Sequence, residues 1–351
     1  MIQQAIRNLV EGRSLDSRDA ESCVGEIVEG GASQAQMGAF LVALRAKGES
    51  PDEIAAFASA LRGYSVRIHP AVGGRLVDTC GTGGDTSKTF NVSTISAVVA
   101  AGAGASVAKH GNRSVTGRCG SADLMESLGF NLAVEPPRVE ESIERNGIGF
   151  MFAPTFHPAM KKVAPVRKEV GVRTIFNLMG PLLNPAGANS QLVGVYAPTL
   201  VPVMAEVLGK LGTERAMVVH GLEGMDEISV SEKTLISTLN EDSISTREYS
   251  PSDFGLQDGR ASVSEPSGPD EAAALAVGLL SGRGTETASM RMVLANASAS
   301  LVVAGLADSL PHGVELARRS IASGAAMKKL TELVRSSGGE ASRIEALAAE
   351  A

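Results

Sequence analysis

The first part of the chain, to about residue 60, carries apolar side chains at helical spacing. Apolar residues recur there at steps of three and four, without the alternation that marks a strand. One stripe consists of Ala20, Cys23, Val24, Ile27 and Val28, and it ends at Gly30 and Gly31. The pattern predicts several short helices in succession, which together form a small all-helical unit.

Two of these expected helices have N-terminal capping signals. Ser33 and Gln36 can form a capping box, in which the serine hydroxyl accepts a backbone amide and the glutamine reaches back to the cap. Ser50 is followed by Pro51, whose missing N–H costs nothing in a first turn, and by Glu53, which completes a second box. We therefore expect helices to begin directly after Ser33 and after Ser50.

From Arg75 onward the chain changes to short apolar segments rich in β-branched residues. Four such segments, each followed by a Gly-rich or polar loop, are residues 76–77, 106–108, 192–195 and 217–219. Helical stretches lie between them, which is typical of an α/β domain with a central, mostly parallel sheet flanked by helices. Residues 240–269 are polar and rich in turn formers, and they predict a surface hairpin or loop region.

Residues 161–185 return to helix-like spacing between prolines, and we expect them to pack back onto the helical unit. The small helical domain would then be discontinuous. It would consist of residues 1–70 with a returning segment at about 163–187, and the larger α/β domain of residues 71–162 and 188–351.

Composition narrows the class of partner. The net charge of -7 argues against broad capture of nucleic acid or acidic lipid, so any anionic substrate requires a local concentration of basic residues. Three cysteines without CxxC spacing fit neither a disulfide framework nor a zinc cluster. The longest apolar run, residues 92–108, contains Ser93, Thr94 and Ser96, so it indicates a buried helix and strand, not a membrane span. Because the start of the chain also lacks a secretory signal, we expect a cytoplasmic protein.

The strongest chemical signal is the run Asp78-Thr-Cys-Gly-Thr-Gly-Gly-Asp85, with Thr89, Asn91, Ser93 and Thr94 shortly after it. Glycines allow backbone amides to approach a ligand closely, and a following helix N-terminus adds oriented N–H groups, which together suit a diphosphate. The run is not a Walker A loop, and Thr86 stands where a dinucleotide fingerprint has its last glycine. A tight turn between strand and helix is the alternative for the glycines alone.

A second signal is the basic loop Lys109-His110-Gly111-Asn112-Arg113-Ser114, followed by Thr116, Arg118 and Ser121. Cations beside small hydroxyl residues in a loop that contains glycine suit a phosphate and a neighbouring carboxylate. This loop would supply the local positive charge that the acidic composition requires, although a solvated basic turn has the same local pattern.

A third signal is the adjacent pair Asp226 and Glu227, which follows the apolar segment 216–219 and His220. Mg²⁺ takes one or two carboxylates together with substrate phosphate oxygens and water. A surface acidic pair is the alternative for Asp226 and Glu227, and His220 is expected to be a packed or hydrogen-bonded histidine.

Taken in order, these three segments resemble the anthranilate phosphoribosyltransferase family. Two further runs carry the same resemblance, residues 149–161 and residues 166–185, the second of which includes Arg167, Arg173 and Pro181. The resemblance extends over roughly residues 15–333. It implies transfer of the phosphoribosyl group of 5-phospho-α-D-ribose 1-diphosphate (PRPP) to the amine of anthranilate, the second step of tryptophan biosynthesis from chorismate. It also implies a homodimer, a site in the cleft between the two domains, and no nucleic-acid or membrane partner.

The resemblance assigns expected roles to residues of this sequence. The residues expected to hold PRPP are Gly81, Gly84, Asp85, Thr89, Asn91, Val92, Ser93, Thr94, Lys109, His110, Gly111, Asn112, Arg113, Ser114, Val115, Thr116, Gly117 and Ser121. Those expected to hold anthranilate are Gly81, His110, Asn112, Arg167 and Pro181, with Arg167 at the carboxylate. Ser93, Asp226 and Glu227 are expected to bind two Mg²⁺ ions. No residue is assigned as a general acid or base, because the amine of anthranilate is already unprotonated at neutral pH.

Three alternative classes remain open at this point. A pyrimidine nucleoside phosphorylase shares the general architecture, but its phosphate loop is closer to KHSTGG than to GTGGD. A type I phosphoribosyltransferase has paired acidic residues after a strand, whereas Asp78 stands alone. Some relatives are thought to bind nucleic acid without biosynthetic activity, which the acidic charge balance and the presence of His110 and Arg167 oppose.

Overall fold

The computed structural model describes residues 1–85, 87, 89–114, 117–257, 263, 265–284 and 287–350. The chain begins with four helices: α1 (Ile2–Val10), α2 (Ser17–Glu29), α3 (Gln34–Lys47) and α4 (Pro51–Arg62). Both expected capping boxes are present at α3 and α4. The first stripe of apolar residues forms the buried face of α2, which Gly30 ends in a left-handed conformation.

A seven-stranded sheet follows, in the order β3-β2-β1-β4-β5-β6-β7. Its strands are β1 (Leu76–Gly81), β2 (Ser106–Gly111), β3 (Ile148–Phe152), β4 (Ser190–Gly194), β5 (Arg215–Gly221), β6 (Thr234–Asn240) and β7 (Ser243–Tyr249). The pairs from β3 to β5 are parallel, and β6 and β7 form an antiparallel edge. The expected fold class, a helical N-terminal unit and a mostly parallel α/β domain, is confirmed.

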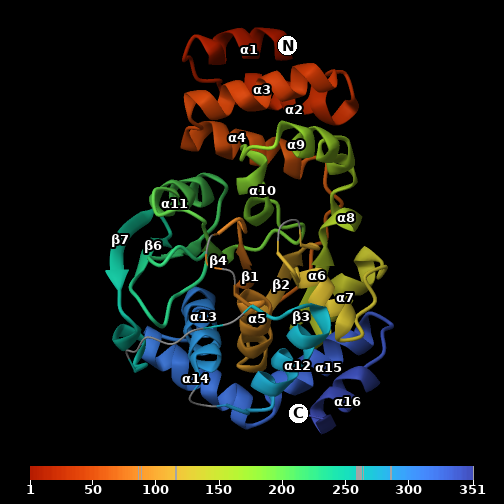
Figure 1. Ribbon diagram of the computed structural model, residues 1–351, viewed down its shortest axis with the longest axis vertical. Helices are drawn as coiled ribbons and strands as arrows, with labels where there is room; N and C mark the ends of the chain where they lie inside the picture. Colours follow the sequence, from red (N-terminus) through yellow and green to blue (C-terminus); the bar gives the residue numbers. More distant parts are fainter. Residues whose placement is uncertain are drawn as a thin grey trace.

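Helices connect and cover the sheet (Figure 1). Between β1 and β5 in the chain, the helices are α5 (Val92–Gly102), α6 (Ser121–Ser127), α7 (Pro136–Asn146), α8 (Ala153–Phe156), η1 (Pro158–Lys162), α9 (Ala164–Val170), α10 (Phe176–Leu182) and α11 (Leu200–Lys210). The remainder are η2 (Pro251–Phe254), α12 (Pro269–Leu280), α13 (Ala288–Ala304), α14 (Leu310–Ala322), α15 (Ala325–Ser336) and α16 (Ser342–Glu350). Among the described residues no helix is both long and apolar enough to cross a membrane.

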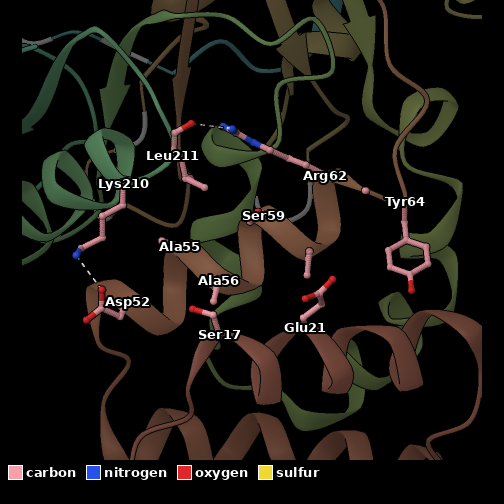
Figure 2. A pocket seen from close by; sticks show the side chains of 12 residues that line it. Ser17, Glu21, Asp52, Ala55, Ala56, Ser59, Arg62, Tyr64, Lys210 and Leu211 are labelled. Carbon is pink, nitrogen blue, oxygen red and sulfur yellow. Dashed lines mark hydrogen bonds and ion pairs between the residues drawn. The ribbon is translucent and has the colours of Figure 1, made fainter.

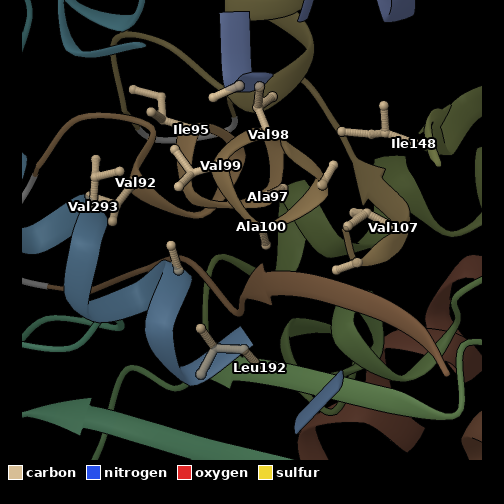
Figure 3. Close-up of a cluster of buried hydrophobic side chains, with 14 of the residues drawn as sticks. Val92, Ile95, Ala97, Val98, Val99, Ala100, Val107, Ile148, Leu192 and Val293 are labelled. Carbon is tan, nitrogen blue, oxygen red and sulfur yellow. The ribbon is translucent and has the colours of Figure 1, made fainter. Parts of the chain in front are cut away.

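The two faces of the sheet belong to two different apolar cores. Side chains alternate across a strand, so Leu192 packs on the face covered by α5 and α13, whereas Val193 packs on the opposite face. Figure 3 shows the first core around α5, with Val99 of α5, Val293 of α13 and Leu192 of β4 among its buried side chains. Nearly every position of α5 is buried, which explains why its sequence is mostly apolar apart from Ser93, Thr94 and Ser96.

The second core continues from the sheet into the helical unit. It contains Phe57 of α4, Val166 of α9, Leu178 of α10, Met204 of α11 and Val193 of β4. The returning segment therefore shares one core with the N-terminal helices, as Figure 1 shows at the top of the molecule. The boundaries at residues 70, 163 and 187 stay a prediction, because buried contacts run across them.

The hairpin at the edge of the sheet begins earlier than the sequence predicts. β7 falls inside the polar region 240–269, but its partner β6 precedes that region. The sequence pattern does not predict β6, because this strand buries polar side chains, including Thr234 and Ser237, and therefore lacks a clear alternation of apolar and polar residues.

Candidate active site

The carboxyl ends of the central parallel strands meet at one edge of the sheet. Gly81, the last residue of β1, pairs with Gly194, the last residue of β4, and the neighbouring strands end at Gly111 and Gly221. Loops that follow parallel strands form the usual ligand site of such sheets. The three motifs singled out in the sequence follow β1, β2 and β5, and the fold therefore brings them together.

Asp226 and Glu227, in the loop after β5, contact two other segments. The Oδ2 atom of Asp226 accepts a hydrogen bond from the backbone N–H of Gly83 over 2.7 Å. The Oε1 atom of Glu227 accepts one from the backbone N–H of Ser93, in the first turn of α5, over 3.2 Å. The two adjacent carboxylates thus connect their own loop to the Gly-rich loop and to the N-terminus of a helix.

The absence of side chains at two strand ends leaves room for Asp226. A Cβ atom at Gly81 would lie 2.3 Å from the Asp226 Oδ2 atom, and one at Gly194 would lie 1.5 Å from its backbone oxygen. Both separations are far below a possible contact distance. Glycine is therefore required at the ends of β1 and β4 for the acidic loop to approach the sheet.

Desolvation disfavours the charged forms of Asp226 and Glu227. The pKa of the Glu227 carboxyl is raised well above its ordinary value, first by burial and then by the neighbouring Asp226. The pKa of Asp226 is also raised, chiefly by burial. Both shifts disfavour the charged forms of the two carboxyl groups, and a bound cation would lower both pKa values.

Lys109 provides one such charge from the end of β2. Its Nζ atom is buried and donates to the backbone oxygen of Thr79 over 2.6 Å and to the Ser93 Oγ atom over 3.4 Å. Lys109 also lowers the pKa of Glu227 and that of Asp78, although burial raises the latter more strongly. One lysine beside several buried carboxyl groups leaves an excess of negative charge.

The donor set suits Mg²⁺ shared with an oxygen-rich ligand. Within the described part of the chain, no cluster of three or more His, Cys, Asp or Glu residues could hold a metal ion. Asp226, Glu227 and the Ser93 hydroxyl offer only hard oxygen donors and fewer than a full octahedral set. A magnesium ion at this edge of the sheet would need further oxygen ligands from water or from a phosphate.

The basic loop after β2 is braced by α6. The backbone N–H of Asn112 donates to the Ser121 Oγ atom over 3.2 Å. Arg113 forms ion pairs with Asp123 and Glu126, at 2.8 Å and 2.7 Å, so its guanidinium is engaged with α6 in this structure. The expected ligand contacts of Val115 and Thr116 lie outside the described residues.

The other expected PRPP residues lie around the same strand ends. Gly84 and Asp85 continue the Gly-rich loop, and the side-chain amide of Asn91 donates to the Cys119 carbonyl over 3.1 Å, which joins the two loops. Val92 and Thr94 are buried in the first turn of α5, and the Thr94 hydroxyl has no hydrogen-bond partner among the described residues. His220 is buried and hydrogen-bonded to the Val195 carbonyl over 2.7 Å, as expected of a packed histidine.

Arg167 and Pro181 come from the returning helical segment. The guanidinium carbon of Arg167 lies 5.7 Å from the ring centroid of Phe176. Burial lowers its pKa, and no carboxylate among the described residues counteracts this effect. Pro181 is buried within α10, where its carbonyl accepts a hydrogen bond from Gln191. A half-buried arginine without an acidic partner among the described residues is a suitable counterion for a carboxylate ligand.

His157 was not identified as a site residue from the sequence. Its ring packs edge to face against His110, with 4.9 Å between the ring centroids. Burial lowers the pKa of His110 to about 3 and that of His157 to about 4, so both rings are neutral at physiological pH. The carbonyls of Gly180 and Leu183 each bond one ring, and the Nε2 atom of each is buried without a partner among the described residues. The pairing of the two rings and their unpartnered Nε2 atoms depend on tertiary contacts, so the sequence alone gives no sign of them.

A separate groove lies in the helical unit. It has a volume of about 710 Å³ and lies between α2, α4 and the end of α11. Figure 2 shows Lys210 bonded to Asp52 on one side of it and Arg62 directed toward Leu211. None of the residues expected to bind substrate lines this groove, so its size does not make it the active site.

The fold and the strand-edge site define a glycosyltransferase with a helical bundle and an α/β domain. The family model described as "Glycosyl transferase family, a/b domain" matches residues 73–327, and "Glycosyl transferase family, helical bundle domain" matches residues 3–65. Within that class, the chain belongs to the anthranilate phosphoribosyltransferase family.

Individual relatives support this membership over nearly the whole chain. The anthranilate phosphoribosyltransferase of Haloarcula marismortui is 49% identical over 333 residues, which cover 95% of this chain and 99% of that protein. The crystal structure of the enzyme from Thermus thermophilus superposes with a TM-score of 0.90 at 41% identity, covering 95% of this chain and 99% of that one. A structure of the Saccharomyces cerevisiae enzyme in complex with PRPP and Mg has a TM-score of 0.87 at 28% identity, covering 96% and 98%. These relatives do not support the phosphorylase or nucleic-acid alternatives.

We expect Gly194→Ala to abolish the function of the acidic loop, because a methyl group would overlap the backbone of Asp226. A displacement on the order of 1 Å is expected to reduce turnover about 100-fold, with a loss of about 1–3 kcal/mol in stability. Steady-state kinetics and urea unfolding measure the two effects. Gly73→Ala, where the new methyl group meets open space, is the control. Wild-type turnover in Gly194→Ala would contradict the close approach.

We expect His157→Asn to flatten the acid side of the stability profile. The depressed pKa of His157 stabilises the native state above the ordinary histidine pKa of 6.5, and this contribution is lost as the pH falls toward about 4. It should amount to about 2–3 kcal/mol between pH 7 and pH 4. Urea unfolding of variant and wild type at each pH measures the difference and removes the opposing effect of carboxyls with raised pKa values. His69→Asn, at an exposed site, should keep the wild-type profile; the same profile in His157→Asn would refute the assignment.

Proposed function

We propose that this protein carries out its family's reaction at the carboxyl edge of the sheet, between the Gly-rich loop, the N-terminus of α5 and the returning helical segment. The phosphoribosyl group of PRPP is transferred to the amine of anthranilate, giving N-(5-phosphoribosyl)anthranilate and diphosphate in the biosynthesis of tryptophan. The observation that supports the proposal most strongly is the half-buried acidic pair, which is hydrogen-bonded to the Gly-rich loop and to the first turn of α5 and whose pKa values are raised, chiefly by desolvation.

PRPP is assigned to the loops after β1 and β2. Backbone amides of the Gly-rich loop and of the first turn of α5 suit its diphosphate, and the buried ammonium of Lys109 adds fixed positive charge. The breaking bond joins ribose C1 to the diphosphate, so negative charge develops on the leaving group. Groups that are already oriented toward that charge lower the barrier without reorganisation.

Magnesium is assigned to Asp226, Glu227 and Ser93, with two ions in the complete complex. The relative from Saccharomyces cerevisiae, whose structure contains PRPP and Mg, supports the choice of metal. When bound, magnesium supplies electrostatic stabilisation to the diphosphate. The protein's own contribution is to hold two half-buried carboxylates beside the Gly-rich loop, where desolvation disfavours their charge and a cation would favour it.

Anthranilate is assigned to the returning segment. Arg167 offers a guanidinium that is half-buried, lies near the ring of Phe176 and has no carboxylate partner among the described residues. His110, Asn112, Pro181 and Gly81 complete the assigned set. The yeast relative in complex with 4-fluoroanthranilate supports an aromatic amino acid substrate of this kind.

The chemistry requires orientation more than a strong base. The aromatic amine is unprotonated at neutral pH and can attack C1 directly once it is placed in line with the leaving diphosphate. His110 is neutral and buried, so it can contact substrate without a change of charge. We assign the protein to the cytoplasm, in keeping with its metabolic substrates. We also assign it a homodimeric state, as the family resemblance implies.

The first experiment is the loss of anthranilate fluorescence after PRPP is added to purified protein, with and without Mg²⁺. We expect a decay that depends on both the protein and the metal. An absence of decay at all Mg²⁺ concentrations would overturn the assigned reaction.

We expect the double variant Asp226→Asn, Glu227→Gln to lose this Mg²⁺-dependent decay by a factor of at least about 100, because the metal loses its protein carboxylates. Without metal the variant should be as stable as the wild type or more stable, since the raised pKa values show that both charges are costly in the native state. Urea unfolding checks this point and separates metal loss from unfolding. The exposed pair Glu241→Gln, Asp242→Asn is the matched control. Full activity in the buried-pair variant would place the metal elsewhere.

We expect Arg167→Ala to raise the KM for anthranilate by about 10- to 100-fold, with a smaller effect on the KM for PRPP, because a charge-assisted pair with the carboxylate is lost. Initial rates with each substrate varied in turn measure the two constants. A main defect in the KM for PRPP would show that Arg167 belongs to the diphosphate site instead.

A further inference from the structure

The Gly-rich loop depends on contacts from outside itself for its shape. Gly83 and Gly84 are consecutive residues with positive φ angles of 65° and 73°. Glycine adopts this conformation readily, but it also has many others available, so fixing two in succession is entropically costly. The N–H of Gly83 is held by Asp226. The carbonyl of Gly84 is held by a residue that none of the assigned roles includes.

That residue is Arg173, which lies between α9 and α10. Its Nη2 atom donates to the Gly84 carbonyl over 2.7 Å. Its guanidinium carbon also lies 4.2 Å from the ring centroid of Tyr196, a separation at which cation–π attraction is favourable. The guanidinium of Arg173 therefore contacts both the Gly-rich loop and the aromatic face of Tyr196.

Tyr196 belongs to the same loop system. It follows β4, and its backbone N–H donates to the Thr82 Oγ1 atom over 3.1 Å. The N–H of Thr82 in turn donates to the Gly194 carbonyl over 2.9 Å. The Gly-rich loop and the loop after β4 are thus joined to each other, and Arg173 lies across both.

On its other side, Arg173 is anchored to the helix that carries Arg167. Gly171, in a left-handed conformation, ends α9 by donating its N–H to the Arg167 carbonyl over 3.3 Å. Thr174, directly after Arg173, is buried and donates its N–H to Asn177 over 3.0 Å. A short segment fixed at both ends thus carries Arg167 and Arg173 together.

We propose that Arg173 is a positioning residue that couples the two substrate sites, because it ties the segment that holds anthranilate to the loop that holds the diphosphate of PRPP. This inference rests on the proposed function. Order in the Gly-rich loop, imposed by a bound diphosphate, is transmitted through Arg173 to the position of Arg167. By thermodynamic linkage, each ligand then strengthens the binding of the other by the same factor.

The coupling is measured with diphosphate and Mg²⁺ in place of PRPP, so that no turnover occurs. The dissociation constant of anthranilate is determined from its own fluorescence, with and without saturating Mg-diphosphate. For the wild type we expect anthranilate to bind about 5- to 10-fold more tightly when Mg-diphosphate is present. For Arg173→Gln we expect the two dissociation constants to agree within about twofold, with the diphosphate-free value close to that of the wild type.

Two further variants distinguish positioning by the Arg173 contacts with Gly84 and Tyr196 from simple attraction of a cation for phosphate. Arg173→Lys keeps the charge but loses the planar guanidinium, so it should not restore coupling. Tyr196→Leu removes the aromatic face and should reduce coupling, and the double variant with Arg173→Gln should lose no more than Arg173→Gln alone. Arg145→Gln, an exposed arginine paired with Glu141 on α7, should retain full coupling.

Each outcome bears on the inference. Coupling that survives in Arg173→Gln, or that is fully present in Arg173→Lys, would overturn the proposed role of Arg173. The same holds if the dissociation constant of anthranilate in the wild type does not change when Mg-diphosphate is added. In all these cases a wild type that still consumes anthranilate and PRPP leaves the proposed function intact. A wild type that neither binds anthranilate nor consumes it refutes the proposed function instead.

Discussion

The placement of two adjacent, half-buried carboxylates at the edge of a parallel sheet is the constraint on which the rest of the site depends. Asp226 and Glu227 are held against the ends of β1 and β4 by backbone amides of the Gly-rich loop and of α5. Their raised pKa values show that the protein alone does not compensate their charge. The native state therefore carries an electrostatic cost that a bound cation removes, as is common where binding sites are less stable than they could be.

Several features of the chain follow from that constraint. Glycine stands at both strand ends because any side chain would collide with Asp226. Lys109 is buried beside the pair, where its charge partly offsets theirs. Gly83 of the Gly-rich loop brings its backbone N–H to Asp226, and the remaining amides of the loop suit an anion. The loop, the acidic pair and the lysine thus form one electrostatic unit.

The helical unit contributes to chemistry because it shares a core with the sheet. α9 and α10 pack among the N-terminal helices, and the same core continues to β4 and α11. Arg167 and Arg173 are thereby presented to the loops at the strand ends from a rigid support. Under the proposed function, the arginine assigned to the carboxylate and the loop assigned to the diphosphate lie on separate parts of the chain, an arrangement in which closure would exclude water from an activated sugar.

The sequence by itself determined the fold class, the helix starts at Ser33 and Ser50, four of the parallel strands and the three loops that bear chemistry. These features rest on local signals, namely capping residues, short apolar segments and glycine-rich turns. Only the tertiary structure decided that Arg113 pairs with α6, that His157 packs on His110, and that Arg173 reaches Gly84. It also revealed β3, a short apolar segment that was not among the expected strands, and the hairpin strand β6, which buries polar side chains. Such contacts join residues far apart in the chain, and their energies depend on burial and distance, neither of which the spacing of residues along a sequence contains.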